Sequence, residues 1–241
     1  MKNCLTMMHP LLFPQKLKNS LGSFALLALL FCCAPAHAQH LVGLRGAVNL
    51  SGIDFQNNDD QKRITTFKNF SLLYTYYHPM WKLFPYFGFQ TGIAYSETGF
   101  ASHDFLREHH QELYDTTRYK VLTIPLISQF HVDFWKMRIL VNIGAFGGYR
   151  LSAKESFYTP AGEHIKRDYL FDCYDIRADY GIIGGGGLAF RIKPFEIHFE
   201  CNYHYSLAML YSPRKYSNAY YIYVYPNQLS FSLALHFQLS K

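Results

Sequence analysis

The sequence has few charged residues and, beyond its first segment, few cysteines. Only 17% of the 241 residues are charged, and Cys173 and Cys201 are the only cysteines after residue 38. Two cysteines cannot build a multi-bridge disulfide scaffold, so we expect both thiols to be free. From Gln39 onward no apolar run has the length of a membrane-spanning helix. These absences exclude a disulfide-rich small domain and a helical membrane protein.

The N-terminal segment has the pattern of a secretory signal peptide. Lys2, Lys16 and Lys18 precede an apolar run from Leu21 to Cys33, which is followed by Ala-Pro-Ala-His-Ala. This pattern predicts a signal peptide over residues 1–38, removed after export, and one mature domain over residues 39–241. Removal of three of the 23 basic residues would leave 20 against 17 acidic ones. Such a small excess gives no indication of a nucleic-acid partner.

Aromatic residues are abundant. They make up 18% of the chain, with 20 Tyr and 21 Phe. This composition suits β-strands and membrane interfaces better than a soluble helical enzyme. Because no apolar helix is available, a mature chain that enters a membrane must do so as a closed barrel.

Apolar and polar residues alternate along about eight segments. The clearest is the last, where Leu229, Phe231 and Leu233 alternate with Ser230, Ser232 and Ala234. Alternation with period two predicts strands that have one apolar and one polar face. Eight strands are the number found in the smallest transmembrane barrels. The predicted strands are Leu41–Ser51, Asn69–Tyr77, Tyr86–Ser96, Tyr119–His131, Arg138–Leu151, Asp179–Ile192, Phe195–Leu207 and Gln228–Leu239.

Two of these strands contain unusual residues. Pro125 lies in the fourth segment and argues against a central strand, because proline lacks a backbone donor. The four glycines Gly184–Gly187 lack the Lys-Ser/Thr and the following helix of a phosphate-binding loop. We interpret them as part of a tight, bent strand.

The predicted connections alternate in length. Long polar segments (52–68, 97–118, 152–178 and 208–227) alternate with short ones (78–85, 132–137 and 193–194), and Trp81 and Trp135 lie in short ones. The pattern predicts an all-β fold, an eight-stranded antiparallel up-and-down transmembrane β-barrel with short periplasmic turns and long extracellular loops. A soluble lipocalin-like barrel is the alternative. It would expose a continuous apolar band to water, which argues against it.

Charged residues gather on the faces opposite the apolar ones and are therefore predicted to point into the barrel. We expect them to form a structural network of ion pairs and hydrogen bonds, because buried charges need partners. The row Glu196, His198, Glu200 and His204 also has the donor types of a metal site, which is the alternative. The predicted network consists of Arg45, Arg138, Arg150, Asp179, Arg191, Glu196, His198, Glu200 and His204.

Two loops carry candidate contact residues. In Ser102–Glu112 the histidines His103, His109 and His110 lie near Glu108 and Glu112, so a mobile polar loop and a metal site are both considered. The second loop is rich in tyrosine. Its members either belong to an aromatic girdle or contact a glycan or protein. The candidate contacts there are Tyr211, Tyr216, Tyr220 and Tyr221.

Several stretches resemble a known family. "GLRGAVNLSG", "GFQTGIAYSETGF", "YKVLTIPLISQF", "VNIGAFGGY" and "YGIIGGGGLAFRI" are similar, in order, to blocks of the PorT-like outer-membrane β-barrel family of Bacteroidetes-type bacteria. The resemblance implies an eight-stranded barrel, usually without a known activity, and its namesake is an accessory of a secretion system. It supplies no catalytic residues.

Three classes of function follow from these features. The first, which we favour, is a non-enzymatic outer-membrane barrel that scaffolds or binds through extracellular loops. A narrow solute channel and a barrel enzyme acting on lipid or peptide are the alternatives. An eight-stranded lumen is too narrow for an open channel, and no nucleophile has an adjacent base near the rim. We expect no catalytic residue, cofactor or metal. The expected partners are outer-membrane lipid and proteins of a secretion or surface assembly.

Overall fold

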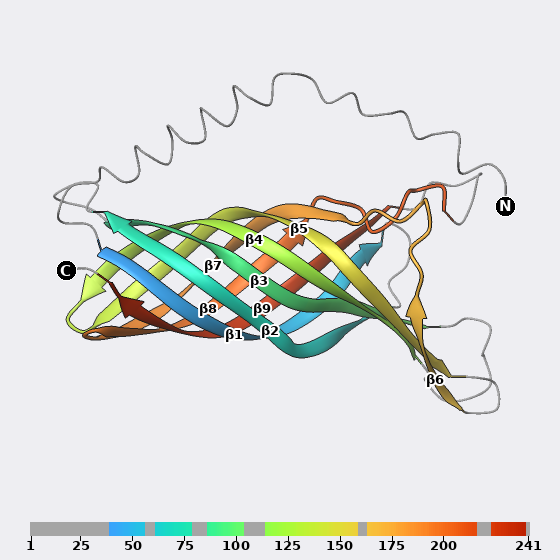
Figure 1. Ribbon diagram of the computed structural model, residues 1–241, viewed down its shortest axis with the longest axis horizontal. Coiled ribbons are helices and arrows are strands. Elements are labelled where there is room, and N and C mark those ends of the chain that lie inside the picture. Colours follow the sequence, from blue (N-terminus) through green and yellow to red (C-terminus); the bar gives the residue numbers. More distant parts are fainter. Residues whose placement is uncertain are drawn as a thin grey trace, which may run out of the picture. The chain divides into compact units, whose positions relative to one another are not determined.

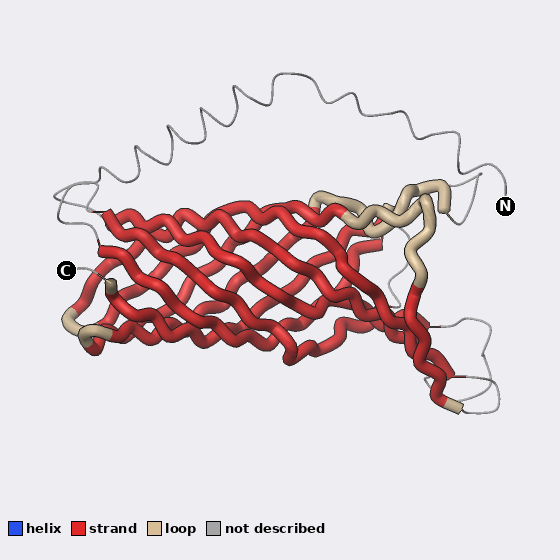
Figure 2. The backbone as a smooth tube through the Cα atoms, viewed as in Figure 1, coloured by secondary structure: helices blue, strands red, loops and turns tan. Residues whose placement is uncertain are grey.

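The computed structural model describes residues 39–55, 61–78, 86–103, 114–158, 163–215 and 223–239. All its regular elements are strands (Figure 2). No helix long and apolar enough to cross a membrane occurs among the described residues. The strands are β1 (Gln39–Phe55), β2 (Gln61–His78), β3 (Tyr86–His103), β4 (Tyr114–Phe134), β5 (Met137–Tyr158), β6 (His164–Tyr169), β7 (Ala178–Ile192), β8 (Phe195–Ser206) and β9 (Val224–Gln238).

Eight of these strands form a closed antiparallel barrel (Figure 1). The order is β1, β2, β3, β4, β5, β7, β8 and β9, and β9 pairs back onto β1. Each predicted segment lies within one barrel strand or extends it by a residue. The predicted eight-stranded fold is therefore confirmed, because period-two alternation identified the membrane-level part of every barrel strand.

The alternation separates an exposed apolar face from a buried interior. Leu233 and Leu235 in β9 are each 51% exposed, whereas Ala234 between them is 1% exposed and His236 is fully buried. Similar rows of exposed Leu, Ile, Val and Phe occur on the other barrel strands. The interior instead holds Arg, Asn, Gln, Glu and His side chains. The apolar band thus lies outside, which is the arrangement of a membrane barrel rather than of a lipocalin.

Pro125 and the glycine run are both accommodated inside regular strands. Pro125 pairs with Phe146 of β5, but the recorded β3–β4 pairs pass from Thr91–Leu126 to Ala94–Thr123, so the ladder is interrupted beside the proline. A Cβ atom on Gly187 would lie 2.1 Å from the carbonyl oxygen of Phe199. The glycine therefore permits close approach of β7 to β8, as the sequence suggested.

The barrel has two different ends. The turns Trp135–Lys136 and Lys193–Pro194 lie at one end, the turn end, together with the start of β1 and the end of β9. At the opposite, loop end, β4 (21 residues) and β5 (22 residues) extend the sheet together with the end of β3, which pairs with β4 as far as Tyr114. Trp135 is 80% exposed in its turn, whereas Trp81 lies outside the described residues. Cys173 and Cys201 form no disulfide with any described residue, as expected.

The loop end contains more β-structure than the sequence predicted. Residues 97–103 and 114–118, expected as loop, extend β3 and β4, and residues 152–158 extend β5. A further strand, β6, pairs only with this outer part of β5 and projects with it from the barrel (Figure 1). The alternation that identifies a half-buried strand is absent in β6, since five of its six residues are exposed.

The barrel lumen as candidate functional site

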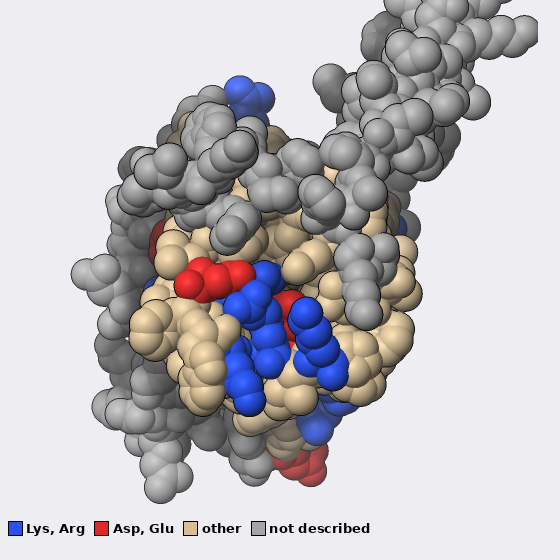
Figure 3. Space-filling view, turned by 90° about the vertical axis from the view of Figure 1, so that its left-hand side faces the viewer, with Lys and Arg blue, Asp and Glu red and all other residues tan. Residues whose placement is uncertain are grey.

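The lumen at the turn end is occupied by a cluster of charged side chains, which we call the inner network (Figure 3). Arg138 bonds Asp133 through Nε at 2.7 Å and Glu196 through Nη1 at 3.3 Å. Arg191 bonds the other oxygen of Asp133 at 2.8 Å. Arg138, only 2% exposed, also lies 4.3 Å from the ring centre of Tyr77. Each buried charge of the inner network therefore has an opposite charge beside it.

Glu200 is the centre of a second group, the central network, deeper in the barrel. Its Oε2 atom accepts hydrogen bonds from the amides of Asn142 and Asn202, both at 3.1 Å, and Arg45 lies 3.9 Å away. Gln129 donates to Asn142 at 3.0 Å, and Tyr77 donates to Gln129. These contacts link β1, β2, β4, β5 and β8 across the lumen. Such a connected polar network stabilises the barrel, and the interior of an eight-stranded barrel is just wide enough for side chains to fill.

His198 connects the two networks. Its Nε2 lies 3.3 Å from Glu196 and its Nδ1 lies 3.4 Å from Glu200. Carboxylates accept and do not donate, so a proton on each ring nitrogen suits this position between two of them. The His198 ring lies against that of His236, with 4.2 Å between centroids and a tilt of 35° between the ring planes. In the described part of the chain, no group of three or more His, Cys, Asp or Glu residues has the arrangement of a metal site.

Arg150 occupies the lumen near the loop end. It pairs with Asp179 at 2.9 Å, and Ser206 also donates to this carboxylate, at 2.5 Å. The other arm of the guanidinium donates to the backbone carbonyls of Ile176 and Met209, at 2.6 and 3.1 Å. Ile176 precedes β7 and Met209 follows β8. A single buried arginine thus holds two loop-end segments onto the barrel.

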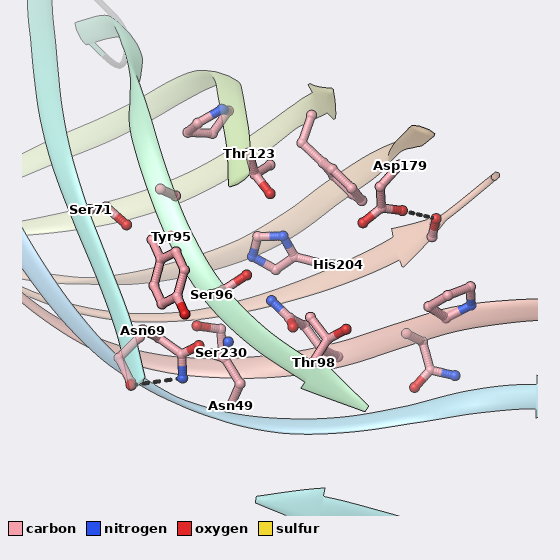
Figure 4. Close-up of a pocket in the computed structure, with 18 of the residues that line it drawn as sticks. Asn49, Asn69, Ser71, Tyr95, Ser96, Thr98, Thr123, Asp179, His204 and Ser230 are labelled. Carbon is pink, nitrogen blue, oxygen red and sulfur yellow. Dashed lines mark hydrogen bonds between the residues drawn. The ribbon is translucent and has the colours of Figure 1, made fainter. Parts of the chain in front are cut away.

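A cavity of about 60 Å³ lies between the central network and Arg150 (Figure 4). Hydroxyl and amide groups from Asn49, Asn69, Ser96 and Ser230 line it, and His204 points into it from β8. This volume holds a few water molecules. The Oδ1 atom of Asn49 has no hydrogen-bond partner in the protein. Since buried oxygens need donors, water is the expected content of the cavity.

Apolar side chains close the lumen beyond the cavity, and we call them the apolar cap. They come from β4, β5 and β9 and from the segment after β8, so opposite walls of the barrel meet in the cap. Ile53, Phe100, Tyr169 and Phe171 pack against it. Both the charged networks and the cap therefore occupy the interior of the barrel. The cap consists of Tyr119, Val121, Ala153, Leu210, Tyr211 and Val224.

A charged clamp fixes the segments that carry the cap. Lys215 bonds Asp175 and Tyr169, and Asp175 pairs in a backbone bridge with Tyr211. Burial alone would raise the pKa of Asp175, but the hydrogen bonds from Lys215, the Asp172 backbone and Tyr169, together with the Lys215 charge, outweigh it and leave this pKa below its usual value. Burial likewise would lower the pKa of Lys215, whereas its bonds to Asp175 and Tyr169 raise it. The pair is therefore ionised at neutral pH.

The structure places most of the predicted lumen residues inside the barrel. Arg191 is partly exposed at the turn end. His204 forms no ion pair with another described residue, and its ring centroid lies 5.7 Å from that of Phe146. Tyr211, considered for surface contacts, is instead 7% exposed within the apolar cap, because its bridge to Asp175 turns it inward. The side chain of His103 and all of His109, His110, Tyr216, Tyr220 and Tyr221 lie outside the described residues.

The predicted network did not include several members that the structure shows, three of them amides and one a carboxylate. Gln129 and Asn142 are fully buried and connect β4 to β5, while Asn202 contacts Glu200. Asp133, at the end of β4, holds both Arg138 and Arg191. Because these residues lie on the strand face opposite the apolar row, the sequence predicts that their side chains point into the barrel. The identity of their partners depends on strand register and cannot be read from one strand.

The fold, the outward apolar band and the charged interior define an eight-stranded outer-membrane β-barrel. The family model described as "Outer membrane protein beta-barrel domain" matches residues 37–212. The chain belongs to this family, and its location is the outer membrane. The loop end is then the extracellular side, since short turns of such barrels face the periplasm.

Solved structures with a similar fold are distant in sequence. Neisserial surface protein A is 10% identical, with 84% of this chain and 99% of that chain covered and a TM-score of 0.40. Ail of Yersinia pestis, solved with a heparin analogue, is 10% identical, with 83% and 99% covered and a TM-score of 0.36. A comparison with curated proteins gave no match.

Proposed function

We propose that the protein is a non-enzymatic outer-membrane barrel that binds a protein partner through the sheet projecting at its loop end. The observation that carries the proposal is the contrast between the obstructed lumen and the β5–β6 extension. Two charged networks and the apolar cap occupy the axis, whereas β6 pairs only with β5 among the described residues. An edge strand offers backbone donors and acceptors to an added strand.

The obstructed lumen supports binding over conduction of solutes. A channel would require the inner network, the central network and the apolar cap to move together, at the cost of exposing buried ion pairs. Catalysis, too, is less well supported than binding. Ser206 donates to Asp179, which pairs with Arg150, and no hydrogen bond joins Ser206 to a histidine in the described residues. The resemblance to PorT-like barrels suggests a protein of a secretion machinery as the partner.

Site-specific crosslinking in native membranes tests this proposal. A photoreactive amino acid at Lys166 in β6 should give a discrete protein adduct, and the same group at the lipid-facing Ile143 should give only lipid adducts. Deletion of residues 160–168 should abolish the protein adduct while the barrel remains folded on unheated gels. Adducts to lipid alone at position 166, or steady ion conductance of the purified barrel in planar bilayers, would contradict the proposed role.

A further inference from the structure

A group of cations lies on the outward face of β4 and β5, where the apolar band ends at the loop end. The band there includes Leu122 and Ile124 of β4, which are 40% and 54% exposed, and Tyr149 and Leu151 of β5, which are 46% and 44% exposed. Residues two apart on a strand share a face, so Lys120 and Arg118 continue the row of Leu122. On β4 the outward face therefore changes from apolar at Leu122 to basic at Lys120.

Strand register places like charges directly opposite each other in this group. Arg118 of β4 pairs with Lys154 of β5, and both side chains are exposed. Lys120 pairs with Ser152 and lies on the same face. Side chains directly opposite on an antiparallel pair have Cβ atoms about 5 Å apart, and like charges at that separation repel. An anion bound between these side chains would relieve the repulsion.

The protein supplies only part of the compensating charge. Asp168 lies 3.6 Å from Lys154, but both side chains are well exposed. Glu97 is opposite Lys120 in register, yet it is buried and the two form no ion pair within 4 Å. Among the described residues, no carboxylate lies within ion-pair distance of Arg118. The exposed cations thus outnumber their carboxylate partners.

A fourth cation extends the group beside β5. Arg177 donates to the backbone carbonyls of Arg150 and Leu151, at 3.1 and 2.9 Å. Its guanidinium stacks over the outward ring of Tyr149 at 4.7 Å and over Phe171 at 4.8 Å. Carbonyls and rings orient this charge without neutralising it. The side chain is therefore fixed next to the lipid-facing surface with its positive charge available.

We propose that Arg118, Lys120, Lys154 and Arg177 bind the phosphate groups of a glycolipid in the outer leaflet, whose acyl chains lie along Leu122, Ile124 and Leu151. Guanidinium and ammonium groups are the usual protein ligands of phosphate. The position next to the apolar band favours a phosphate carried by a lipid over free phosphate, because the chains gain contact with that band. Each basic side chain near a charged membrane surface contributes about 1 kcal/mol to such binding.

Lipid titration of the full barrel in nanodiscs of phosphatidylcholine tests the proposal. The probe is purified lipid A, a diphosphorylated glucosamine lipid, and the comparison is the same lipid after enzymatic removal of its phosphates. Arg118→Gln with Lys154→Gln should weaken lipid A binding about 25-fold, which is fivefold per cation. The matched control Lys136→Gln with Lys193→Gln removes two exposed turn-end cations and should leave binding unchanged.

Two further readouts keep the test decisive. Because the Arg118–Lys154 repulsion is relieved, the first double variant should be at least as stable as the parent in phosphatidylcholine alone. Equal affinity of parent and variant for lipid A, or equal binding of the dephosphorylated lipid, would overturn the proposal. Displacement of lipid A by millimolar inorganic phosphate would instead identify a site for free anions, which also contradicts it.

Discussion

Arg150 and Asp179 form a 2.9 Å ion pair between β5 and β7, and the same guanidinium holds the backbone of two loop-end segments. Arg150→Leu should lower the free energy of unfolding by about 3–5 kcal/mol, because it leaves Asp179 buried and without its cation. Unfolding of the parent and the variant by guanidinium chloride in lipid vesicles measures this loss of free energy. Arg167→Leu is the control, since its ion pair with Glu155 involves a 63% exposed side chain and should cost about 1 kcal/mol or less. Similar losses in both variants would contradict the role assigned to Arg150.

Glu200 compensates Arg45 and His198 in the central network. Glu200→Leu should destabilise the barrel by about 3–5 kcal/mol, because it leaves Arg45 and two amides without their acceptor. Adding Arg45→Met should recover part of the loss, since the double variant buries no unpaired cation. The shift between folded and heat-unfolded bands on gels, followed with temperature, checks both variants. An unchanged transition for Glu200→Leu would show that the network does not stabilise the fold.

Leu233 and Ala234 are consecutive residues that face lipid and lumen, respectively. Leu233→Arg should destabilise the barrel by roughly 2–4 kcal/mol, the cost of an arginine near the bilayer midplane. In a variant without Cys173 and Cys201, Leu233→Cys should react with an apolar, membrane-partitioning thiol reagent. Ala234→Cys should be protected from it. Reaction of the folded Leu233→Cys protein with a water-soluble reagent would contradict the lipid-facing assignment.

The clamp between Asp175 and Lys215 should weaken at the two extremes of pH. The folded pKa of Asp175 is depressed, so its contribution is present above the usual carboxyl pKa of about 4 and is lost as the pH falls through the lower folded value. The folded pKa of Lys215 is raised, so its contribution is complete below its usual pKa of about 10.4 and is lost only at higher pH. The backbone amide of Asp172 donates to Asp175 at 2.8 Å and reports its protonation by NMR.

The titration has a defined control. In Lys215→Met the Asp172 amide signal should titrate at higher pH than in the parent, because the nearest cation is lost. An identical midpoint in both proteins would show that Lys215 does not hold the Asp175 carboxylate.

Strand direction and facing were predictable from sequence because the bilayer imposes one simple rule. In β9 every second residue must be apolar where the strand crosses lipid, and this identified the interior side of Ala234 and His236. Beyond the membrane that rule no longer applies. The outer part of β5 and the whole of β6 have mixed polar residues on both faces, so sequence alone suggested loops there.

The partners inside the lumen could not be assigned for a different reason. The sequence showed that Glu200 and Arg191 both face inward, but they lie at different depths, and Arg191 reaches Asp133 instead. The depth of each side chain along the barrel axis depends on the register and tilt of the eight barrel strands. The apolar cap was likewise unforeseen, because Leu210 and Tyr211 lie in an irregular segment whose path no periodicity defines.

The length of β4 and β5 determines how far from the cell the protein can act. About ten residues suffice for a tilted strand to cross the bilayer, whereas these strands have 21 and 22 residues. Four residues of β5 follow Lys154, which we place at the level of the lipid phosphates, so at about 3.3 Å per residue and a tilt near 40° they carry the β5–β6 hairpin roughly 10 Å above that level. A hairpin at that height stands among the sugar chains of the cell surface. It contacts molecules that a barrel whose strands end at the membrane surface would not reach.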